Sequence, residues 1–135
     1  MWFRYSAVAV LKWIAVNVLT IVMLFLVLPK TWRGDMLAVP IWLMIFVVSA
    51  AFAYWALIKK VPGWKDMLKL MAAWLVVTMV LQNAFEYYVI GRAFFILRSL
   101  ESLIAYGVEI LGIIVGTIFV RWRFALKAKS LVAEK

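Results

Sequence analysis

Long apolar runs separated by short polar segments dominate the hydrophobic pattern of this chain. Four runs, at about residues 7–28, 37–58, 68–90 and 99–120, reach the roughly 20 residues that a helix needs to cross the hydrocarbon core of a bilayer. The runs are continuously apolar and do not alternate, which excludes the strands of a transmembrane barrel. The pattern therefore predicts an all-α integral membrane protein with four transmembrane helices in an up-down bundle.

Proline and glycine, which commonly end or begin helices, mark the three connections between the runs. They are Pro29, Gly34 and Pro40 in the first connection, Pro62 and Gly63 in the second, and Gly91 in the third. Each connection has only about 8 residues, which is too short for a folded extramembrane module. We therefore expect residues 1–135 to form a single four-span membrane domain that ends in a basic cytoplasmic tail, 121–135.

The composition agrees with a membrane protein, since 69% of the residues are hydrophobic and the formal net charge is +9. In a soluble protein such a charge would suggest nucleic acid, but here the basic residues cluster at the ends of the apolar runs. Eleven of the 15 Lys and Arg residues fall on one predicted side: Arg4, Lys12, Lys59, Lys60, Lys65, Lys69, Arg121, Arg123, Lys127, Lys129 and Lys135. The other side has Lys30, Arg33, Arg92 and Arg98.

This charge asymmetry predicts that both termini lie in the cytoplasm, because basic residues are retained on that side of a membrane. We expect the chain to reside in a prokaryotic plasma (inner) membrane. Its expected partners are the lipid bilayer, with anionic lipids at the cytoplasmic face, and another membrane protein or a second copy of itself. Nucleic acid is not an expected partner, because attraction to anionic lipid already accounts for the basic tail.

The chain has no Cys and no His, which excludes disulfides, thiolate nucleophiles, Cys/His zinc sites and imidazole-ligated haem. It also lacks a phosphate-binding loop and a Ser/His/Asp set. We therefore expect no enzymatic activity, no metal and no cofactor.

Glu109 is the most informative polar residue, because it lies near the middle of the fourth run. A charged side chain at that depth costs about 2.5–3.5 kcal/mol, so it must be neutral or find a partner. The Lys and Arg residues lie at the borders of the runs, so we expect no cation of this chain at the depth of Glu109. The expected partners are the amides of Asn17, Gln82 and Asn83, which would form an intramembrane polar cluster with it.

Four further charged residues lie near the predicted outer ends of the third and fourth runs, where we expect ion pairs. They are Glu86, Arg92, Arg98 and Glu101. For Glu101 a second interpretation is that the acid stabilises the first turn of its helix after Ser99.

Small residues of the fourth run recur at helical spacing and predict a helix-packing face of Ala105, Gly112 and Gly116 on the side of Glu109. This face has three interpretations. It closes the four-helix bundle around a neutral Glu109, it docks on a helix of another protein, or it belongs to a proton or cation pathway.

From these observations we expect a small non-enzymatic membrane subunit or accessory protein that docks through its transmembrane helices on a larger membrane complex or on itself. The alternative is a small oligomeric ion channel or proton-coupled transporter that uses Glu109. An enzyme acting on lipid is the weakest alternative, because the chain offers no obvious nucleophile.

Overall fold

All regular secondary structure is helical in the part of the chain that the computed structural model describes, residues 2–31, 35–85, 87–88 and 100–135. The elements are α1 (Trp2–Val22), which continues as a π-helix η1 (Met23–Val27), α2 (Asp35–Leu57), α3 (Trp64–Phe85) and α4 (Leu100–Ala133). Each of the four long helices is apolar enough to cross a membrane. The prediction of an all-helical chain with four such helices is therefore confirmed.

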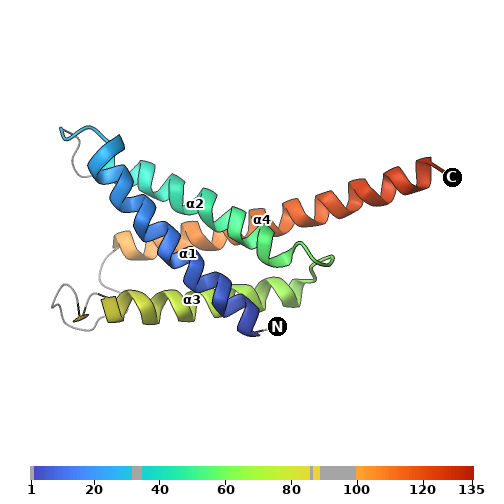
Figure 1. Ribbon diagram of the computed structural model, residues 1–135, viewed down its shortest axis with the longest axis horizontal. Helices are drawn as coiled ribbons and strands as arrows, with labels where there is room; N and C mark the ends of the chain where they lie inside the picture. The colour runs from blue at the N-terminus through green and yellow to red at the C-terminus, as the bar shows by residue number, and fades with distance from the viewer. Residues whose placement is uncertain (1, 32–34, 86, 89–99) are drawn as a thin grey trace.

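Successive helices run in opposite directions (Figure 1), so the start of α1, the end of α2 and the start of α3 lie toward the same end of the molecule. The most extensive interface joins α2 to α4, and α1 packs mainly on α3. In the same view α1 runs obliquely to α3.

The start of α3 is stabilised by a local hydrogen bond, whereas the start of α2 differs from the prediction. At the start of α3 the backbone N–H of Gly63 donates a hydrogen bond of 3.1 Å to Asp66 Oδ2, as in a capping box. By contrast, Pro40 lies inside α2, which already begins at Asp35. The placement of Pro40 in the first connection was therefore wrong. Pro40 is the sixth residue of α2, so it removes the one hydrogen bond that its N–H would donate to the carbonyl oxygen of Met36, and the helix continues past it.

α4 is much longer than its predicted span, with 34 residues. At about 1.5 Å per residue it measures roughly 50 Å, which exceeds the approximately 30 Å hydrocarbon core of a bilayer. Residues 121–133, predicted as a basic tail, continue this helix and project beyond the other three (Figure 1). The extension contains no Gly or Pro and is rich in Ala, Leu, Lys and Arg, which favour helix.

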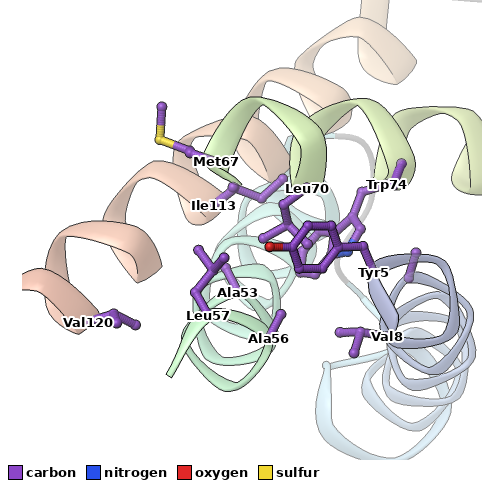
Figure 2. Close-up of a cluster of buried hydrophobic side chains, with 12 residues drawn as sticks. Tyr5, Val8, Ala53, Ala56, Leu57, Met67, Leu70, Trp74, Ile113 and Val120 are labelled. Carbon is purple, nitrogen blue, oxygen red and sulfur yellow. The ribbon is translucent and has the colours of Figure 1, made fainter. Parts of the chain in front are cut away.

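A cluster of buried apolar side chains joins the four helices (Figure 2). It comprises Tyr5, Val8 and Ala9 of α1, Ala53, Ala56 and Leu57 of α2, Met67, Leu70, Ala73 and Trp74 of α3, and Ile113 and Val120 of α4. The alanines of α2 allow close approach between helices. Such packing is what holds helices together in lipid, where apolar side chains gain nothing by leaving the solvent.

Candidate functional site

Glu109 of α4 forms a buried ion pair with Lys12 of α1, through Oε1 and Nζ. Both residues are almost fully buried, with exposed fractions of 4% for Glu109 and 2% for Lys12. Thr78 of α3 completes the group, since its Oγ1 lies 3.3 Å from Lys12 Nζ and 3.5 Å from Glu109 Oε1. Three helices thus meet at one charged contact.

The expectation that no cation of this chain reaches the depth of Glu109 was wrong. α1 begins at Trp2, so Lys12 lies at the middle of that helix and not near its border. Tyr5, Val8 and Ala9 are the other buried residues of α1, and Lys12 continues their stripe at helical spacing. This spacing is the signal in the sequence that could have placed Lys12 inside the bundle.

The ring of Trp74 provides a further contact for the cation. Lys12 Nζ lies 4.9 Å from the ring centroid, and Trp74 is fully buried. The face of an indole attracts a cation, an effect that strengthens when water is excluded. Lys12 therefore contacts a carboxylate, a hydroxyl group and an aromatic ring.

A cavity of about 280 Å³ lies beside the ion pair. Its walls are Lys12, Trp13, Val16, Asn17 and Thr20 of α1, Ile45 of α2, Thr78 and Gln82 of α3, and Ala105, Tyr106 and Glu109 of α4. A water molecule occupies about 30 Å³ in the liquid, so this cavity has room for several waters or for a small polar solute. The amide, hydroxyl and charged groups in its walls can solvate such an occupant.

The predicted amide cluster is brought together in part. Asn17 and Gln82 line the cavity with Glu109. Asn17 Nδ2 donates to the carbonyl oxygen of Trp13 at 2.8 Å, and Gln82 Oε1 accepts from Trp13 Nε1 at 3.2 Å. Asn83 is buried elsewhere and donates to the carbonyl oxygen of Met79 at 2.7 Å, within its own helix.

The sequence reasoning missed Thr78 and Trp74 as well as Lys12. Leu70, Trp74, Thr78 and Gln82 follow one another at intervals of four residues along α3. Such spacing places them on one stripe of the helix, and Leu70 and Trp74 are fully buried. This stripe, which changes from apolar to polar residues along α3, was the signal in the sequence that could have placed Thr78 beside the cavity.

The predicted packing face is divided between two surroundings. Ala105 and Glu109 line the cavity, whereas the two glycines contact α2. A Cβ atom on Gly112 would lie 2.7 Å from Ser49 Cβ, and one on Gly116 would lie 2.5 Å from the carbonyl oxygen of Ala50. The small residues therefore serve close packing of α4 on α2 within this chain.

The predicted outer ion pairs stay a prediction. Glu86, Arg92 and Arg98 lie outside the described residues. Glu101 belongs to the first turn of α4, but its side chain is not among those described.

Within the described residues, no group of three or more acidic side chains is placed to hold a metal ion. The chemistry of the site is therefore that of one carboxylate, one ammonium group and the polar cavity beside them. Comparison with protein-family models, with curated proteins and with solved structures found no match for this chain.

Proposed function

We propose that this chain is a small oligomeric proton-conducting protein of the plasma (inner) membrane, with both termini in the cytoplasm and Glu109 as its proton-carrying group. The observation that carries the proposal is the polar cavity beside the buried Lys12–Glu109 pair. Ionisable residues inside a membrane are expensive, and in membrane proteins they commonly mark ion or substrate pathways.

A purely structural ion pair gives no reason for a cavity next to it. Protein interiors are close-packed, and the residues that line this partly open space forgo packing contacts on the side that faces it. Here the lining carries two amides, Asn17 and Gln82, and three hydroxyl groups, those of Thr20, Thr78 and Tyr106. A space of this kind is suited to water or to a small polar solute.

Protonation of Glu109 couples chemistry to helix contacts. The ionised carboxylate holds Lys12 and thereby links α4 to α1, while Thr78 ties both to α3. When the carboxylate takes up a proton, its charge disappears and its attraction for Lys12 weakens, while the contacts of Lys12 with Thr78 and the ring of Trp74 remain. The affinity between α1 and α4 then depends on the proton. A single four-helix unit leaves little room for a pathway, so the functional unit is a homo-oligomer.

Proton flux into vesicles tests this function. The full chain, reconstituted with a pH-sensitive dye inside the vesicles, should acidify the lumen when a proton gradient is applied. The double variant Lys12→Met/Glu109→Met replaces the pair by apolar side chains of similar length, so it should fold and carry no flux. Glu134→Gln removes an acid at the exposed end of α4 and should keep the flux. Absence of flux for correctly inserted wild-type protein refutes the proposal.

A second function, docking as a non-enzymatic accessory subunit, is favoured by the projecting part of α4. The C-terminal part of α4 projects beyond the bundle (Figure 1), and Trp122, Leu126, Leu131 and Val132 are exposed along it. The glycine face predicted for docking is already covered by α2, so a partner would contact this extension instead.

Affinity isolation in mild detergent distinguishes this second function. The full chain should retain a partner that a chain ending at Arg123 loses, while both stay folded. A monodisperse monomer without any co-purifying protein, observed for the full chain, contradicts docking.

A further inference from the structure

Three basic side chains surround a hollow where α4 leaves the bundle. Lys59 lies just after the end of α2, and Arg123 and Lys127 lie one turn apart on α4. With Ile58 and Phe124 they line a space of about 260 Å³. The hollow is thus basic on three sides and apolar on the others.

The guanidinium group of Arg123 is held in place by Tyr54 of α2. Arg123 Nη1 donates to the hydroxyl oxygen of Tyr54 at 2.6 Å, and the guanidinium carbon lies 6.0 Å from the ring centroid. Because a guanidinium group carries five N–H donors, most of them remain free for another acceptor. An oriented arginine of this kind is suited to recognising an oxyanion.

No acidic residue lines the hollow, according to the described side chains. Asp66 at the start of α3 is engaged by Lys60, 3.2 Å away, and by the backbone N–H of Gly63. Glu134 lies seven residues beyond Lys127, about 10 Å along the helix. Arg123 and Lys127 are four residues apart, and like charges at that spacing repel each other. Among the described side chains, these three cations therefore have no anionic partner.

The position of the hollow indicates the kind of anion. It begins one turn beyond Val120, the last buried residue of α4, and the neighbouring Trp122 is exposed. Tryptophan is enriched at the boundary between acyl chains and headgroups, and basic residues near this boundary attract anionic lipid. The apolar walls, Ile58 and Phe124, suit an occupant that continues into hydrocarbon.

We propose that Lys59, Arg123 and Lys127 bind the phosphate group of an anionic phospholipid at the cytoplasmic end of the α2–α4 interface. This site is separate from the cavity at Glu109 and does not depend on transport. Its occupant fixes the direction in which the α4 extension leaves the membrane, since it bridges Arg123 and Lys127 to the end of α2.

The test is a titration of the purified full chain in detergent with phosphatidylglycerol, followed by native mass spectrometry, with phosphatidylcholine as the uncharged reference. Wild-type protein should take up one phosphatidylglycerol molecule in preference to phosphatidylcholine. Lys127→Gln should weaken this binding about fivefold, and Lys59→Gln/Lys127→Gln about 25-fold, because each basic residue contributes on the order of 1 kcal/mol.

Lys129→Gln is the matched control, because it removes the same charge two residues away, on the opposite side of the helix. It should leave the affinity within about twofold of wild type. Equal losses for Lys127→Gln and Lys129→Gln would show a diffuse attraction of the whole extension and overturn the site. Inorganic phosphate is the second probe: if it displaces the lipid at low millimolar concentration, the occupant is a free phosphate and the assignment to a lipid is wrong.

Discussion

Replacing Lys12 by leucine removes the cation of the buried ion pair and leaves the carboxyl group of Glu109 among apolar helices. The exposed fractions of the two side chains are 2% and 5%, so the pair is largely shielded from bulk solvent and its loss is costly. The substitution also removes the contact of 3.3 Å between Lys12 Nζ and Thr78 Oγ1. We therefore expect a large loss of stability from this single change.

The expected magnitude follows from the cost of isolating a buried charge. Removal of one partner from a buried pair costs about 3–5 kcal/mol. Glu109 can escape part of this cost by taking up a proton, so we expect about 3 kcal/mol for Lys12→Leu. The double variant Lys12→Leu/Glu109→Leu removes both charges, and it should lie within about 1 kcal/mol of wild type because an apolar pair packs without desolvation cost.

The assay is a double-mutant cycle on the purified chain in detergent. Unfolding by titration with sodium dodecyl sulfate gives the free energies, and heating gives the midpoints, for which a loss of about 3 kcal/mol corresponds to a shift on the order of 10 °C. The cycle needs Lys12→Leu, Glu109→Leu and the double variant, and their non-additivity measures the coupling between the two residues. We expect a coupling of at least about 2 kcal/mol.

Two results would refute the reasoning. If Lys12→Leu costs less than about 0.5 kcal/mol, Lys12 does not form a buried ion pair with Glu109. If the free-energy losses of the two single variants simply add in the double variant, Lys12 and Glu109 stabilise the protein independently of each other. The ion pair then does not join α1 to α4.

Three further predictions concern packing, capping and orientation. Gly116→Leu should separate α4 from α2 and strongly lower the midpoint of thermal unfolding, since even a Cβ atom there would lie 2.5 Å from the Ala50 carbonyl oxygen. Gly107→Ala is the matched control: its Cβ would meet nothing within 4 Å, so this change should raise the free energy of unfolding by up to about 1 kcal/mol. Asp66→Ala should destabilise the start of α3 by about 1 kcal/mol, measured by the same titration, whereas Asp66→Asn should lose less because its side-chain oxygen still accepts from Gly63. Because the chain has no Cys, single cysteines report orientation: a membrane-impermeant maleimide applied to intact cells should label Lys30→Cys and leave Ser130→Cys unlabelled, and the reverse pattern would contradict cytoplasmic termini.

The four apolar helices could be predicted from the sequence, because the ability to cross a bilayer depends on local hydrophobicity and length. The four predicted runs correspond to α1 with η1, α2, α3 and the first part of α4. The bounds were predicted less accurately, since α2 begins at Asp35 and α4 continues without interruption beyond residue 120. Proline near a helix start and a change from apolar to basic residues alter the sequence pattern without ending the helix.

The cavity and its ion pair were decided by the tertiary structure. The sequence indicated that Glu109 needs a partner, and it indicated Asn17 and Gln82 as polar residues of neighbouring spans, but it did not show that Lys12 supplies the charge. That choice depends on which side of α1 packs inward and on how α1 inclines across α3, and both are set by contacts between residues far apart in the chain. The same holds for Gly112 and Gly116: their spacing predicts close approach of another helix, whereas only the packed bundle determines that α2 is that helix, because its Ala50 and Ala53 leave the space that the glycines require.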